Sequence, residues 1–195
     1  MRQKRKRKTN AANKLKDTEI AITPSIYQFD IEFVKSYYLS YRMLETPHVV
    51  VGAAIATKVV NPALSIPLAL GSHFLLEKIP HWNPHLNRET EKYGQPTKKS
   101  TQIVIADATT ALVFGSFVAY QALPNTGHAI GILATCLASV LPDLIEAPYF
   151  FLHIRKEAIK KWIKFQKSLQ VDAPISWGIL TQLVVIAVGA WWIFS

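Results

Sequence analysis

The chain has 195 residues, of which half are hydrophobic and 18% are charged, and its formal net charge is +9. This length suits a single domain. The one cysteine, Cys136, lies inside an apolar run, which excludes a disulfide framework and argues against a thiolate metal site. Because the basic residues flank apolar segments, the charge is typical of a membrane protein facing an anionic leaflet, and it argues against nucleic acid as a partner.

Residues 1–29 are predicted to be a basic, disordered tail. Eight positive charges precede the first acid and no apolar core follows them, so we expect no cleavable signal peptide. A tail that fixes topology and contacts lipid headgroups is favoured over one that binds nucleic acid. Residues 30–44 place three tyrosines on one helical stripe, which predicts a helix lying in the interface or packed on the protein. Met43 is an alternative translation start, which would make the residues before it an extension.

Residues 48–79 are apolar but interrupted by Lys58, Asn61 and Pro62. Each half would be about 20–25 Å long as a helix, which is short of the roughly 30 Å hydrocarbon core of a bilayer. Asn61 suits a helix cap and Pro62 suits the first turn of the helix that follows. The segment is therefore either a hairpin that enters and leaves on one side, or one long broken span.

Three further segments predict transmembrane helices: residues 101–122, 127–152 and 175–195. Asp107 is the only charge in the first, and the last has no charge and carries tryptophans near its ends, an aromatic belt pattern. Residues 155–169 combine a broad apolar face with six basic residues. They predict an amphipathic helix on an anionic membrane surface, with a protein partner as the alternative.

Charge asymmetry decides between the hairpin and the broken span. In the hairpin topology the tail, residues 82–100 and residues 153–174 share one side of the membrane and carry 18 of the 22 basic residues. A single crossing would separate the eight charges of the tail from the other ten. The positive-inside rule therefore favours an all-α integral membrane protein with a cytoplasmic N-terminus. Its membrane domain, residues 30–195, contains the hairpin, three transmembrane helices and an interfacial amphipathic helix.

In this topology three histidines and four acids lie at similar depth on the cytoplasmic side: His48, His73, Glu77, His81, Asp107, Asp143 and Glu146. Taken singly they have ordinary interpretations, such as a helix cap for His48 or a hydrogen bond within the bundle for Asp107. Taken together the acids would repel one another, and a charge inside a membrane helix costs about 2.5–3.5 kcal/mol. A divalent cation would offset both effects, and imidazole with carboxylate favours Zn²⁺, Mn²⁺ or Fe²⁺. His128 and His153 are interpreted as ordinary interface residues.

Part of this pattern resembles a known family. His48 opens the first apolar segment, a His-x-x-x-acid-x-x-Pro-His pattern runs from His73 to His81, and Asp143 follows Leu-Pro. In these respects residues 44–85 resemble the small bacterial proteins named membrane-bound, metal-dependent, LexA-binding hydrolases of the inner membrane. Glu77 stands where that family more usually has Asp, and residues 82–100 lack its His-Arg-Gly-x-x-His motif. The resemblance implies a metal site and a location in the bacterial inner (cytoplasmic) membrane.

These observations predict a membrane-embedded, metal-dependent hydrolase acting on a phosphoester or lipid-linked substrate from the cytoplasmic leaflet. His48, His73, Glu77 and Asp143 would hold the metal, with His81 as a further ligand or a group that polarises the leaving group. Asp107 or Glu146 would act as general base. Two non-enzymatic alternatives stay open: a proton- or ion-coupled transporter that uses the acids as a relay, and a membrane scaffold whose basic segments recruit a partner.

Overall fold

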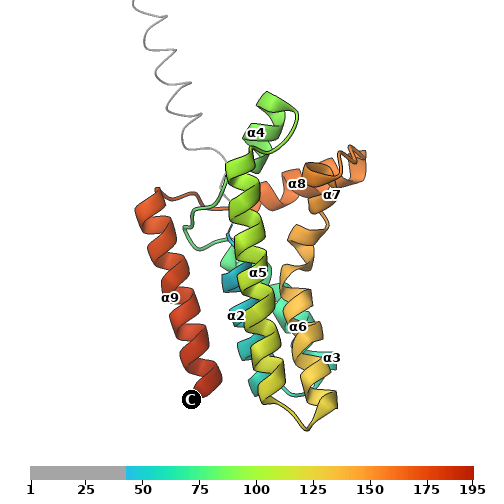
Figure 1. The fold of residues 1–195 in the computed structure, drawn as a ribbon, viewed down its shortest axis with the longest axis vertical. Helices are drawn as coiled ribbons and strands as arrows, with labels where there is room; N and C mark the ends of the chain where they lie inside the picture. The colour runs from blue at the N-terminus through green and yellow to red at the C-terminus, as the bar shows by residue number, and fades with distance from the viewer. Residues whose placement is uncertain (1–42) are drawn as a thin grey trace, which may run out of the picture. The chain divides into compact units, whose positions relative to one another are not determined.

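The computed structural model describes residues 43–195, and this part of the chain is all-α with eight helices (Figure 1). They are α2 (Glu45–Lys58), α3 (Pro62–Leu76), α4 (Leu86–Tyr93), α5 (Lys98–Gln121), α6 (Thr126–Leu144), α7 (Ala147–Phe151), α8 (Glu157–Leu169) and α9 (Ile175–Phe194). The predicted tail, 1–29, lies outside the described residues, as does the predicted interfacial helix, 30–44, except for Met43 and Leu44, which are not helical.

Helices α2 and α3 form the predicted hairpin. The side chain of Asn61 caps α3 by accepting a hydrogen bond from the Ala63 N–H (3.0 Å), and Pro62 occupies the first turn, where its missing N–H leaves no helical bond unmade. The rings of His48, near the start of α2, and His73, near the end of α3, stack with their centroids 4.2 Å apart. The two helices are therefore antiparallel, which excludes one long broken span.

Helix α2 is the centre of the bundle. It packs against α3, α5, α6 and α9, and nine of its 14 residues are buried. The second half of its contact face is made of small residues, Gly52, Ala53, Ala54 and Ala56, which let helices approach closely. At Gly52 a Cβ atom would lie only 2.8 Å from Ser139 Oγ of α6, so a larger residue would push the two helices apart. This close approach places His48, one turn before Gly52, beside α6.

Helices α5, α6 and α9 are long enough and apolar enough to cross a membrane. Their outer faces expose large apolar side chains, including Leu112 of α5 (69% exposed) and Val188 of α9 (57%). A soluble protein rarely exposes apolar surface so extensively, whereas hydrocarbon chains of a bilayer would cover it favourably. The three helices correspond to the predicted spans 101–122, 127–152 and 175–195.

The second of these spans is shorter than predicted, because the chain leaves the helix after Leu144 and begins α7 at Ala147. Pro148 accounts for the break, since proline has no N–H and its ring would collide with the carbonyl group of Leu144, four residues earlier. Residues 82–100, between the hairpin and the first long apolar helix, contain a short helix, α4. It ends at Gly94, whose φ of 78° is the left-handed conformation that glycine adopts readily.

Helix α8 lies across one end of the bundle, at a large angle to α5 and α6 (Figure 1). Trp162 packs edge-on against Phe74 of α3, and Ile163 is buried with Leu86 and Phe150. Most of its lysines are exposed. The amphipathic helix predicted at 155–169 is therefore present, and its apolar face is used against α3, α6 and their neighbours. Its contact with lipid stays a prediction.

Candidate metal centre

Four of the predicted metal ligands form one buried cluster: His48, His73, Glu77 and Asp143, whose ligand atoms all lie within 4.8 Å of one another. They come from α2, α3, the C-cap of α3 and α6. With bonds of about 2.0–2.1 Å, the ligand atoms of one cation lie about 3.3 Å apart in a tetrahedron and about 4.2 Å apart across an octahedron. The cluster therefore needs only a small contraction to hold one ion.

Two pairs of atoms within the cluster already have this spacing. The Nε2 atom of His48 lies 3.4 Å from Oε1 of Glu77, and Nε2 of His73 lies 3.9 Å from Oδ1 of Asp143. The second distance is too long for a hydrogen bond. Both are within the range expected for two ligands of a single cation.

The hydrogen bonds of His73 leave a lone pair facing the cluster. Its Nδ1 lies 2.8 Å from the backbone carbonyl oxygen of Ser139, which can only accept, so this nitrogen carries the proton. In the neutral ring Nε2 then has a lone pair directed at Asp143 and at Oε1 of Gln166, 3.0 Å away. Three acceptor atoms therefore face one another: Nε2 of His73, Oε1 of Gln166 and Oδ1 of Asp143. Either a proton on Nε2 or a cation must lie between them. An imidazole that donates from one nitrogen to a carbonyl group and coordinates through the other is the usual arrangement at metal sites.

Buried polar atoms without a well-directed hydrogen bond support the cation. Among the described residues these include both ring nitrogens of His48, Oε2 of Glu77 and Nε2 of His81. A buried polar atom left in this state costs about 1–3 kcal/mol. All of these atoms are metal-ligand types, so the residues present fit a divalent transition metal.

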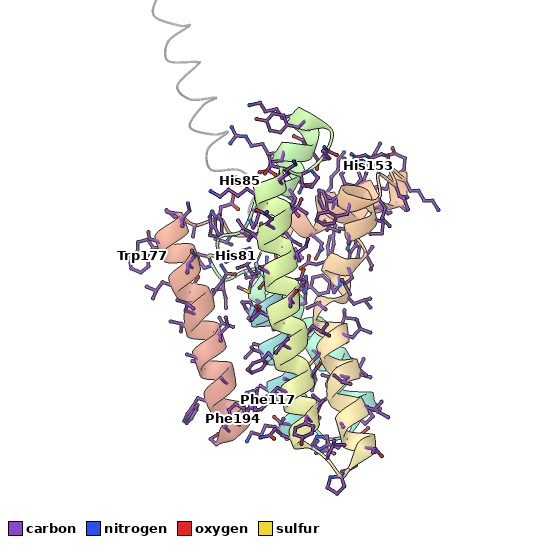
Figure 2. The ribbon with its side chains drawn as sticks, viewed as in Figure 1. His81, His85, Phe117, His153, Trp177 and Phe194 are labelled. Carbon is purple, nitrogen blue, oxygen red and sulfur yellow. The ribbon has the colours of Figure 1, made fainter. Side chains whose placement is uncertain are left out.

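His81, the fifth predicted ligand, lies beside the cluster but does not join it. Its Nδ1 donates to the Ile79 carbonyl oxygen (2.6 Å), and its Nε2 lies 3.9 Å from Oε2 of Glu77. Burial lowers the pKa of His81, against the opposing effect of the Glu77 carboxylate, so the ring is neutral at neutral pH. Figure 2 shows His81 in the loop beside α9, well away from Phe117 and Phe194.

Gln166 of α8 is a site residue that the sequence did not reveal. Its Oε1 lies against His73, and its Nε2 is within 3.2 Å of three acceptors: the Pro142 carbonyl oxygen, Oδ1 of Asp143 and Oε1 of Glu146. These acceptors fix the orientation of the amide. One feature of the sequence does indicate it. Gln166 follows Ile163 by three residues and Trp162 by four, which places it on the apolar face of α8. An uncharged polar side chain on that face is expected to contact a buried polar group.

The two predicted general bases occupy different surroundings. Asp107 of α5 holds the start of α2, since its carboxylate accepts hydrogen bonds from the backbone N–H groups of Glu45 and Thr46 and from the Thr46 hydroxyl group (2.6 Å). Glu146 is fully buried and accepts from Gln166 at 2.7 Å. The structure therefore connects Glu146, through Gln166, to the metal cluster, and gives Asp107 a capping contact with α2.

One hollow adjoins the cluster, and a second continues from the first. A cavity of about 110 Å³ is lined by Asp143 and Asp107 together with apolar residues such as Val104 and Phe150. A second, apolar groove of about 320 Å³ runs between α5 and α6 as far as Gly115 and Cys136. The two share Glu45, Ala108 and Leu144, so the groove continues from the cavity along α5 and α6.

No protein-family model, curated protein or solved structure matches this chain.

Proposed function

We propose that this protein is a membrane-embedded, metal-dependent hydrolase that acts on a phosphoester or lipid-linked substrate. The observation that carries the proposal is the buried His48, His73, Glu77 and Asp143 cluster, whose ligand atoms converge within 4.8 Å beside a cavity. Two imidazoles with two carboxylates suit Zn²⁺, Mn²⁺ or Fe²⁺. The resemblance of residues 44–85 to the bacterial inner-membrane hydrolases agrees with this assignment.

The residues of the cluster and its neighbours have distinct roles in this proposal. A bound divalent cation supplies Lewis acidity and lowers the pKa of water. His48, His73, Glu77 and Asp143 would hold it, and Ser139 and Gln166 would orient His73 and Asp143. Glu146 is the better candidate for general base, because Gln166 links it to Asp143, whereas Asp107 is engaged with the start of α2.

The two hollows favour an amphipathic substrate. The cavity lined by Asp143 would take the polar reacting group, and the groove between α5 and α6 would take an apolar chain. The lining of the groove, such as Leu112, Leu133 and Val140, is suited to hydrocarbon. A lipid-linked phosphoester could then enter sideways from the bilayer and keep its tail there.

The basic face of α8 supports a location at the anionic, cytoplasmic leaflet. Lys161, Lys164 and Lys167 are exposed on the side of the helix away from Gln166, and basic residues near an anionic membrane contribute about 1 kcal/mol each. We propose that α8 rests on this leaflet and covers the metal centre.

The experiment is a hydrolysis assay in detergent micelles with a small panel: bis(p-nitrophenyl) phosphate, p-nitrophenyl phosphate and a diacyl phosphatidic acid. We expect cleavage that depends on Mn²⁺ or Zn²⁺, is abolished by EDTA and is lost in Glu77→Gln. The matched control is Glu91→Gln, an exposed position on α4, which should keep the wild-type rate. Cleavage that survives both EDTA and Glu77→Gln would contradict the proposal, as would purified metal-loaded protein that cleaves no phosphoester.

A further inference from the structure

We propose that Glu77 bridges two cations, and that His81 holds the second one. This inference rests on the proposed function, because it adds a second metal position to the same centre. The two oxygens of Glu77 face different histidines: Oε1 lies 3.4 Å from Nε2 of His48, and Oε2 lies 3.9 Å from Nε2 of His81. A carboxylate with an imidazole on each oxygen is arranged to bridge two ions.

The distance between His81 and Glu77 indicates coordination and not a hydrogen bond. At 3.9 Å the two atoms are too far apart to share a proton. Two ligands of one cation lie about 3.3–4.2 Å apart when their bonds are about 2.0–2.1 Å long. Neither Oε2 of Glu77 nor Nε2 of His81 has a hydrogen-bond partner among the described residues, although both side chains are buried.

The tautomer of His81 directs its lone pair at Glu77. Because Nδ1 donates to the carbonyl oxygen of Ile79, Nε2 of the neutral ring carries the lone pair. His73 has the same arrangement, with Nδ1 on the carbonyl oxygen of Ser139. Both rings are therefore set in the manner of metal-bound histidines, with one nitrogen fixed by a backbone carbonyl group and the other facing a carboxylate.

The loop that carries His81 is held firmly. The His81 N–H donates to the Val171 carbonyl oxygen (3.3 Å), and the His81 carbonyl oxygen accepts from the Ala173 N–H (3.2 Å). On either side, α9 donates to the same loop, from Thr181 to the Pro80 carbonyl oxygen and from Gln182 to the Trp82 carbonyl oxygen. A loop fixed at four points is preorganised, which lowers the cost of binding an ion.

A buried amide lies two residues further along the chain. Asn83 is 6% exposed, and its Oδ1 has no hydrogen-bond partner in the described part of the chain. An imidazole with a bridging carboxylate suits Mn²⁺ or Zn²⁺, with water completing the coordination. Two ions about 3.5–4 Å apart are the arrangement used by many phosphoester-cleaving enzymes, because both the attacking and the leaving oxygen are stabilised.

The test is the number of metal ions per chain. Full-length protein in detergent is stripped with chelator, reloaded with Mn²⁺, desalted and analysed by plasma mass spectrometry. We expect about two ions per chain in the wild type. We expect about one in His81→Asn, because asparagine keeps the N–H donor toward Ile79 and removes the nitrogen that faces Glu77. The control, His153→Asn, changes an exposed histidine and should keep both ions.

A second readout on the wild type does not depend on how well the variant folds. Two Mn²⁺ ions bridged by one carboxylate are exchange-coupled, so the electron paramagnetic resonance spectrum should differ from the six-line spectrum of an isolated ion. One ion with an uncoupled spectrum would overturn this inference and leave the proposed hydrolase intact. Two ions in both the wild type and His81→Asn would remove His81 from the site. No ion at all would refute the second position and the proposed function together.

Discussion

Gln166 offers a sharp test of how the metal centre is held, because one uncharged side chain contacts His73, Pro142, Asp143 and Glu146. In Gln166→Leu a side chain of similar size removes every one of these contacts. Nε2 has two hydrogens for three acceptors, so at most two of its hydrogen bonds are complete at one time. Hydrogen bonds to charged groups contribute about 1.5–3 kcal/mol each, and partial relaxation would reduce the sum.

We therefore expect Gln166→Leu to lower the free energy of unfolding by about 2–4 kcal/mol. For a chain of this size that corresponds to a decrease of roughly 5–15 °C in Tm. The assay is thermal unfolding in detergent, followed by tryptophan fluorescence in excess chelator, so that the hydrogen bonds are measured without metal. In the metal-loaded state the variant should also bind about 10–100-fold more weakly, as is usual when a residue that orients ligands is removed.

The matched control is Gln102→Leu, which makes the same change at an exposed position on α5 and should leave Tm within about 2 °C of the wild type. A Tm for Gln166→Leu that equals that of the control, together with unchanged metal affinity, would refute the view that α8 secures the centre through this amide.

Three further predictions concern α8, the topology and Asp107. A peptide of residues 155–169 should bind anionic vesicles more tightly than neutral ones. Replacing Lys161, Lys164 and Lys167 by glutamate should abolish the preference, since each lysine contributes about 1 kcal/mol. Equal binding to both lipids would exclude positive charge as the cause of membrane binding. Reporter fusions should place residues 82–100 in the cytoplasm and Ser195 outside it, and a cytoplasmic Ser195 would contradict the hairpin topology. Asp107→Ala should lower the free energy of unfolding by about 1–2 kcal/mol, because the hydrogen bonds that cap α2 are lost, while the metal content stays unchanged. Loss of metal with an unchanged free energy of unfolding would instead make Asp107 a metal ligand.

The hairpin could be predicted because its determinants are local, and the cluster could be predicted from the topology that the hairpin sets. Asn61 and Pro62 interrupt a run too short to cross a bilayer twice, and their capping role follows from residue type alone. Once the hairpin is fixed, His48, His73 and Glu77 must lie at one end of it. Asp143 joins them because α6 returns to the same end of the bundle.

Other features depended on tertiary contacts that no periodicity encodes. Gln166 reaches the cluster only because α8 folds back over the end of α6, where Pro142 leaves a carbonyl oxygen that Trp162 and Gln166 bind. Asp107 was expected among the acids because of its depth in the span, but which neighbour it contacts depends on how α5 packs beside the start of α2. The break before α7 had a local signal in Pro148, but the apolar composition of residues 127–152 concealed it.

The central claim, that a divalent metal is held by residues from separate helices, is tested most directly by the metal content of the purified protein. Wild-type protein, His73→Ala and His128→Ala are purified in detergent and analysed by plasma mass spectrometry. His128 is the control because it contacts the Ala56 carbonyl oxygen near the turn of the hairpin, away from the cluster. We expect transition metal in the wild type and in His128→Ala, and little in His73→Ala. Metal absent from the wild type, or retained equally by all three proteins, would contradict the metal centre and favour a proton relay built from the same acids.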